Sequence, residues 1–88
     1  MIPTIIEKGR MEHAIGLSVY PRFYGNKHGT YYRAYRNYYT ITKGGNDEKI
    51  DKLVEQGLME EDGRCCYRVT EEGYKHLEKK YNIRIVRY

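Results

Sequence analysis

The sequence of 88 residues contains no tryptophan, one phenylalanine and one serine. It also lacks a run of about 18 apolar residues, the length that a membrane-spanning helix requires. Its first residues do not follow the basic-then-apolar order of a signal peptide. These absences predict a cytoplasmic chain that does not contact a membrane. A chain this short buries only about 60–65% of its unfolded surface, so we expect a single domain over residues 1–88 without a deep cleft.

Motifs of catalysis and of metal binding are absent as well. The only serine is Ser18, the three histidines lie far apart, and no nucleophile elbow, phosphate-binding loop or paired-carboxylate spacing occurs. Cys65 and Cys66 are adjacent, whereas paired zinc ligands are separated by about two to four residues. Neighbours on a strand point to opposite faces, so we expect reduced thiols, one buried and one exposed. The sequence predicts no enzyme, no metal and no cofactor.

Acidic residues are missing from positions 13–46, which carry five basic residues. Residues 47–78 reverse this balance with ten acids and five bases, so the net charge of +4 conceals two opposed regions. Seven of the eleven tyrosines lie between positions 20 and 39. A small core cannot pair so many buried hydroxyl groups. We therefore expect several of these rings on the surface or in an interface.

The spacing of apolar residues predicts three helices, with a β-hairpin between the last two. Asn46 is placed to cap the second helix and Gly57 to end it, while Thr70 is placed to cap the third. Glu48 and Lys52 have the spacing of an i,i+4 ion pair. The expected ranges are 11–18, 46–56 and 70–81 for the helices and 58–69 for the hairpin, whose second strand begins at Cys65.

The other segments are less regular. Residues 20–30 are rich in proline, glycine and asparagine, which is typical of a loop. Residues 31–42 leave two alternatives open: their tyrosines would share a helix face, whereas the aromatic and β-branched run at 38–42 suits a strand. Residues 83–88 begin with an alternating pattern that is compatible with a short edge strand.

Two resemblances to known families rest on particular stretches. The stretches LVEQGLM (53–59) and YRVTEEG (67–73), followed by Leu77, resemble the recognition helix and wing of MarR-like regulators. This resemblance implies an α+β fold of the winged-helix type, with about three helices, a β-hairpin wing and a short terminal strand. Together with HAIG (13–16) and YRNYY (35–39), the same stretches resemble a family of small phage and prophage proteins. That family implies a phage or prophage origin, and with it the cytoplasm of a bacterial host cell, but no established activity.

The basic, tyrosine-rich stretch carries the strongest functional signal. Basic side chains neutralise phosphates, and aromatic rings stack on unpaired bases with about 1–3 kcal/mol each. The residues expected to bind nucleic acid are Arg22, Lys27, Tyr31, Tyr32, Arg33, Tyr35, Arg36 and Lys43. Tyrosine and arginine are also enriched in protein-interface hot spots, so a module that binds a host or phage protein is the alternative. A third interpretation is structural, with Tyr38 and Tyr39 in the core and the other rings covering it.

The predicted helix at 46–56 argues against ordinary binding in the DNA major groove. Its charged residues sum to −2, and the hairpin turn that follows is acidic too. Both would repel a phosphate backbone, whereas the corresponding helix of a winged-helix regulator enters the groove. If nucleic acid binds, we therefore expect it on the opposite, tyrosine-rich face. If a protein binds instead, the acidic helix and turn would contact a basic partner or mimic nucleic acid. A homodimer is also open.

Overall fold

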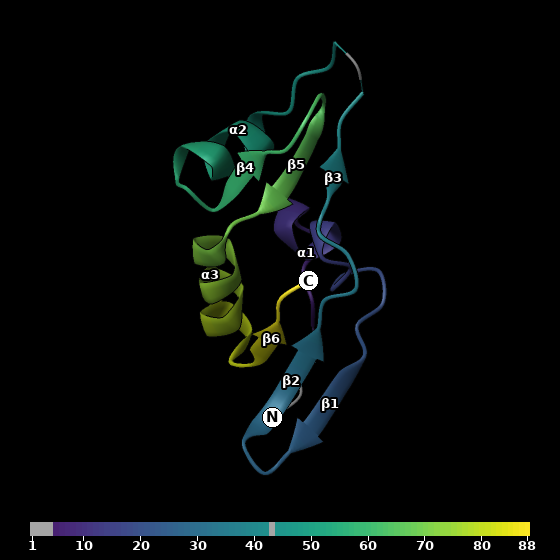
Figure 1. Cartoon of the computed structure of the whole chain (residues 1–88), viewed down its shortest axis with the longest axis vertical. Coiled ribbons are helices and arrows are strands. Elements are labelled where there is room, and N and C mark those ends of the chain that lie inside the picture. The colour runs from purple at the N-terminus through teal and green to yellow at the C-terminus, as the bar shows by residue number, and fades with distance from the viewer. Residues whose placement is uncertain (1–4, 43) are drawn as a thin grey trace.

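A computed structural model describes residues 5–42 and 44–88 (Figure 1). Its described residues form three helices and two three-stranded sheets, which confirms the expected α+β class. In chain order the elements are α1 (Arg10–Ala14), β1 (Phe23–Asn26), β2 (Gly29–Arg33), β3 (Tyr39–Thr40), α2 (Glu48–Glu55), β4 (Met59–Glu61), β5 (Cys66–Val69), α3 (Glu71–Tyr81) and β6 (Arg84–Val86).

The molecule is elongated, 45 × 22 × 21 Å, and carries one sheet toward each end (Figure 1). At the hairpin end, β1 pairs antiparallel with β2, and β6 pairs parallel with the other edge of β2. At the α2 end, β5 pairs antiparallel with both β3 and β4, and α2 packs against β4. The helix α1 lies between the two sheets, and α3 leads from β5 to β6 (Figure 1).

One hydrophobic core joins the two ends. The α1 region contributes the largest share, because a short helix followed by tight turns buries side chains on several sides. The core residues are Met11, Ala14, Ile15, Leu17, Tyr32, Ala34, Ile50, Met59, Val69, Tyr74, Leu77, Ile83 and Ile85. Both sheets and all three helices therefore depend on the same packed interior.

The predicted second helix is present, but its capping residue is Asp47 rather than Asn46. Oδ1 of Asp47 accepts hydrogen bonds from the Lys49 N–H at 3.1 Å and the Ile50 N–H at 3.2 Å. The other carboxylate oxygen accepts from Nε of Arg10 at 3.2 Å. The prediction of Asn46 is wrong because Asp47 lies the right two and three residues ahead of the free amides.

Gly57 and Thr70 act as the sequence predicts. Gly57 follows α2 with a left-handed φ of +76°, which ends the helix. Thr70 caps α3 by accepting from the Gly73 N–H at 3.1 Å, and its hydroxyl donates to the Gly57 carbonyl at 2.6 Å. This last bond fastens the start of α3 to the end of α2. Residues 84–86 form β6, so the terminal strand is also confirmed.

The loop expected at 20–30 is instead largely a β-hairpin. Phe23 pairs with Tyr32, Asn26 pairs with Gly29, and Lys27 and His28 form the turn. The side chain of Asn26 accepts from the His28 N–H at 2.8 Å, which closes the turn locally. The loop prediction is wrong because glycine and asparagine serve the turn, while aromatic residues pair across the strands.

Three further expectations change. The first helix ends at Ala14, because Gly16 takes a left-handed φ of +84° and the following residues form turns. Within residues 31–42, residues 31–33 belong to β2 and residues 39–40 to β3, and none is helical, which decides the open question in favour of strands. Cys65 lies in the β4–β5 turn with φ 59°, not in the strand, and both thiols are free and half-buried.

Candidate nucleic-acid interface

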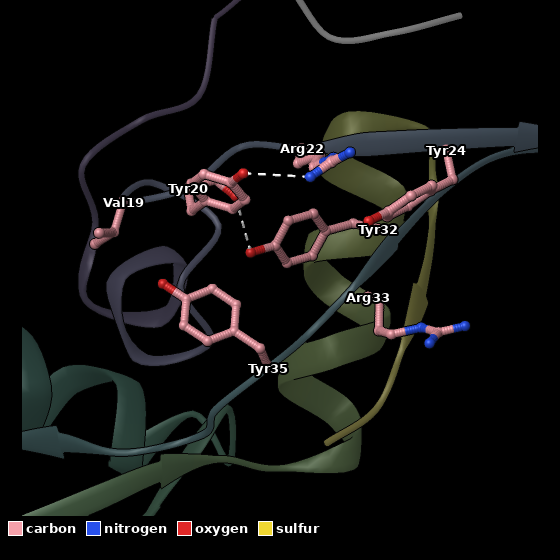
Figure 2. A pocket seen from close by; sticks show the side chains of 7 residues that line it. All are labelled: Val19, Tyr20, Arg22, Tyr24, Tyr32, Arg33 and Tyr35. Atoms are coloured by element: carbon pink, nitrogen blue, oxygen red, sulfur yellow. Dashed lines mark hydrogen bonds between the residues drawn. The ribbon is translucent and has the colours of Figure 1, made fainter.

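A pocket of about 520 Å³ lies beside the β1–β2 hairpin, facing the turns that follow α1 (Figure 2). All of its lining residues except Tyr32 are exposed, and none of them is acidic. The lining consists of Val19, Tyr20, Arg22, Tyr24, Tyr32, Arg33 and Tyr35. The pocket thus combines aromatic rings, guanidinium groups and one aliphatic side chain in a region that bears no negative charge.

Tyr32 anchors the pocket to the core. Its side chain is only 1% exposed, and its hydroxyl donates to the main-chain carbonyl of Tyr20 at 3.2 Å. Burial raises the pKa of this phenol to about 12, and the neighbouring Tyr35 adds to the shift. The prediction that Tyr32 stacks on a base is therefore wrong, because a buried ring offers no free face.

Tyr35 lies against the turn that ends α1. Gly16 makes room for this ring, since a Cβ at that position would overlap its edge. The other side of Tyr35 is open, and the side chain is 46% exposed. Figure 2 shows the ring reaching toward Val19 and Tyr20 across the pocket. The close approach at Gly16 therefore holds Tyr35 in place while nearly half of its side chain stays exposed.

The outer face of the hairpin carries a second aromatic group. The rings of Tyr24 and Tyr31 stack with centroids 5.4 Å apart and an angle of 24°. The Arg22 guanidinium lies 5.8 Å from the Tyr24 centroid and donates to the Tyr20 hydroxyl at 3.4 Å (Figure 2). These contacts hold a guanidinium group between two rings while leaving the side chain exposed.

Arg36 plays a more structural part than the sequence indicates. One of its terminal nitrogens donates to the His13 carbonyl at 2.7 Å, and its Nε is buried without a hydrogen-bond partner in the described part of the chain. The guanidinium also lies 5.6 Å from the Tyr35 centroid and 5.5 Å from that of Tyr38. Arg36 therefore packs against the ring of Tyr35 and helps to fix its position.

The remaining predicted site residues are dispersed. Lys27 is exposed in the hairpin turn, beyond the pocket lining. Arg33 is exposed and points away from the rings of the pocket (Figure 2). Lys43 lies outside the described residues. The structure thus brings together Arg22, Arg33 and Tyr35 in the lining of one pocket, with Tyr31 stacked on the lining residue Tyr24.

Tyr20, Tyr24 and Val19 belong to the pocket, although the sequence reasoning did not select them. The density of tyrosines from position 20 onward was the available signal. The loop expected at 20–30 did not allow this signal to be interpreted, because only paired strands show which rings share a face. We use "tyrosine–arginine surface" below for Tyr20, Arg22, Tyr24, Tyr31, Arg33 and Tyr35.

Comparisons with known proteins add no family to this description. The chain matches no protein-family model, no curated protein and no solved structure. Within residues 5–42 and 44–88, no helix is long and apolar enough to cross a membrane. No group of three or more histidine, cysteine, aspartate or glutamate side chains there could hold a metal ion. The chemistry of the surface itself must therefore indicate the function.

Proposed function

We propose that this chain is a non-catalytic accessory protein of a phage or prophage that binds single-stranded nucleic acid through the tyrosine–arginine surface. The observation that supports this most is the pocket itself, where exposed rings and guanidinium groups meet without any carboxylate. Arginine neutralises and binds phosphates, and tyrosine faces stack on bases that are not already paired. The phosphate and the base of a nucleotide would thus each contact a complementary side chain within one site.

The arrangement of the rings favours unpaired bases over a duplex. Tyr20 and Tyr35 line a concave pocket of about 520 Å³, which a stacked base pair cannot enter without being opened. Tyr24 and Tyr31 already stack on each other, so they extend an aromatic platform along the outer face of the hairpin. A strand would follow this platform with its phosphates toward Arg22 and Arg33.

The winged-helix type is part of the same proposal. The helix α2, the stop at Gly57 and the hairpin β4–β5 follow each other as in a recognition helix and wing, and β3 adds a third strand to β5. The described chain has a single helix between β3 and that hairpin. Because the outward charges of α2 are mainly acidic, we place nucleic acid at the hairpin end instead.

The proposal is tested by titrating labelled single-stranded and duplex oligonucleotides at several salt concentrations and following fluorescence anisotropy. Single-strand affinity should fall with salt at a log–log slope of about −0.7 for each phosphate contact. Arg22→Ala and Arg33→Ala should each reduce that slope by about 0.7. The matched control is Arg64→Ala, which removes the same charge from the exposed β4–β5 turn at the other end.

Substitutions of the rings complete this test. Tyr20→Ala and Tyr35→Ala should each weaken single-strand binding by about 5- to 150-fold, because each removes one stacking face. Duplex binding should change less. The control Tyr88→Ala removes a ring that is 77% exposed and lies outside the pocket lining. Equal losses in all three variants, or no binding at low salt, would contradict the proposal.

A second candidate is a module that binds a host or phage protein through the same surface. The composition of the pocket favours it, because tyrosine and arginine, which supply all of its lining except Val19, are enriched in protein-interface hot spots. This candidate predicts weak, non-saturating binding of oligonucleotides. It also predicts a complex in host lysate that resists nuclease and is lost in the Tyr20→Ala and Tyr35→Ala variants.

A further inference from the structure

A second pocket of about 520 Å³ lies at the α2 end, and none of its lining residues belongs to the tyrosine–arginine surface. It is formed by the segment leading into α1, by one face of α2 and by α3. We call it the lysine pocket. Its basic side chains are Lys8, Arg10, Lys49, Lys52 and Lys80.

One lysine, Lys80, forms ion pairs with both carboxylates of the lysine pocket. Nζ of Lys80 donates to Glu7 at 2.7 Å and to Glu12 at 3.1 Å. Glu12 is almost fully buried and also accepts from the Tyr81 hydroxyl at 2.5 Å. Burial alone would lower the pKa of the Lys80 ammonium, but its bonds to the two carboxylates raise it instead. These groups therefore form a closed cluster that leaves no carboxylate for the other cations.

The other cations of the pocket differ in whether they form an ion pair. Arg10 pairs with the capping carboxylate of Asp47 at 3.2 Å. Among the residues that the structure describes, Lys8, Lys49 and Lys52 form no ion pair. The i,i+4 pair that the sequence predicts between Glu48 and Lys52 is not formed either. Like charges held around one cavity repel each other, so an anion in the cavity would stabilise the site.

The charges of α2 are sorted onto two faces. Lys49, Lys52 and Gln56, at i, i+3 and i+7, all line the pocket. The acidic residues, with the same spacing, lie on another face, are exposed and do not contribute to the pocket; they are Glu48, Asp51 and Glu55. The net charge of the helix thus conceals a basic and amide-bearing face that is directed at a cavity.

We infer that the lysine pocket binds a compact oligophosphate, of the kind carried by a nucleoside di- or triphosphate. Ammonium groups on flexible stems act as point charges that suit clustered phosphate oxygens. Gln56 and His76 add side-chain donors beside them. Met11 and Leu53 supply an apolar wall on which an uncharged part of the ligand can pack. The cavity volume lies within the range of small-molecule sites.

The surroundings of the pocket disfavour an extended nucleic-acid backbone as its ligand. A strand that crossed α2 would meet the exposed carboxylates of Asp51 and Glu55 as soon as it left the cavity. A compact anion reaches the lysines without meeting them. The inference is thus independent of the tyrosine–arginine surface, which would bind its ligand at the other end of the molecule.

The test uses inorganic triphosphate and ATP as probes, with the whole chain, in isothermal titration calorimetry at low and at physiological salt. Both probes should bind, and the double variant Lys49→Gln/Lys52→Gln should weaken binding by at least about tenfold, because it removes two charge-assisted contacts. The matched control Arg64→Gln/Lys79→Gln removes the same charge from exposed positions outside the pocket. Circular dichroism should show that both variants retain their helices.

The hairpin variants separate this inference from the proposed function. Arg22→Ala and Tyr35→Ala should leave triphosphate affinity unchanged, whatever they do to oligonucleotide binding. Equal losses in the pocket variant and in the control variant would overturn the inference, since they would indicate a general charge effect. Oligonucleotide binding that depends on Lys49 and Lys52, without any binding of triphosphate or ATP, would overturn it as well.

Discussion

The tyrosine–arginine surface and the lysine pocket are both positive, but they are built in opposite ways. The first holds a guanidinium group against rings and contains no carboxylate, so its positive charge lies on planar groups beside aromatic faces. The second gathers ammonium groups around a cavity, where carboxylates and hydrogen bonds fix the walls. Net charge alone would assign both the same partner. The chemistry of the neighbouring side chains is what led us to propose stacked bases for one and clustered phosphates for the other.

The two ends are also held together differently, and substitutions can test that difference. The largest expected effect is at the hairpin end. Tyr32→Ala should lower the free energy of unfolding by about 3–5 kcal/mol, because it empties a fully buried ring position under the hairpin. Urea unfolding measures this loss. Tyr24→Ala on the same hairpin is the control, and we expect it to cost about 1 kcal/mol or less because its ring is exposed. Similar losses in both variants would show that aromatic burial does not hold the hairpin.

The next largest effect concerns a hydrogen-bonded junction at the α2 end. The side-chain amide of Asn37 accepts from the Val69 N–H at 2.8 Å and donates to the Val69 carbonyl at 3.0 Å, as a neighbouring strand would. Asn37→Ala should lower the free energy of unfolding by about 2–3 kcal/mol, because it leaves two main-chain groups of a buried residue unpaired. Asn46→Ala at an exposed position serves as the control. Equal unfolding midpoints for the two variants would refute the role of Asn37.

The smallest effect depends on pH. Partial burial would raise the pKa of the Asp47 carboxyl, but hydrogen bonds from Ile50, Arg10 and Lys49 outweigh it and lower the pKa. A lowered pKa stabilises the fold at pH values above the unfolded value of about 4, and this contribution is lost as the pH falls through the folded value. Asp47→Asn, which keeps a capping oxygen, should therefore be less stable than the wild type at pH 7.

Urea unfolding of both proteins between pH 7 and pH 3 tests this dependence. The gap between them should narrow in the acid range, because the wild-type carboxyl becomes protonated there. A gap that stays constant over the whole range would mean that the charge of Asp47 does not contribute.

The sequence predicted the α2 and α3 helices well because their ends are fixed by local chemistry. Thr70 caps through an amide three residues away, and Gly57 stops a helix through its own backbone. The same is true of the β4–β5 hairpin, whose strands are neighbours in the chain. Asp47 shows the limit of this reasoning, since two adjacent capping residues compete and the contact from Arg10 favours one of them.

The hairpin end could not be predicted in the same way. Tyr31 and Tyr32 are neighbours on one strand and point to opposite faces, so composition cannot tell which ring is buried. The answer depends on pairing with β6, which lies far along the chain. The sequence did not predict the lysine pocket for a related reason. The net charge of the predicted helix sums over its acidic and its basic face, so it does not show the basic face. Long-range pairing and the orientation of a helix are properties of the packed structure.

The parallel pairing of β2 with β6 also sets the order in which a growing chain can acquire its binding surface. β2 emerges from the ribosome early, but Ile85, the partner of Tyr32, follows only after the second sheet and α3 have been synthesised. Until then β1 and β2 form an isolated two-stranded ribbon, which is marginally stable in water. The rings of the tyrosine–arginine surface therefore gain their full support only when β6 has been synthesised. If the proposed function holds, affinity for a nucleic acid would arise late in the synthesis of this region.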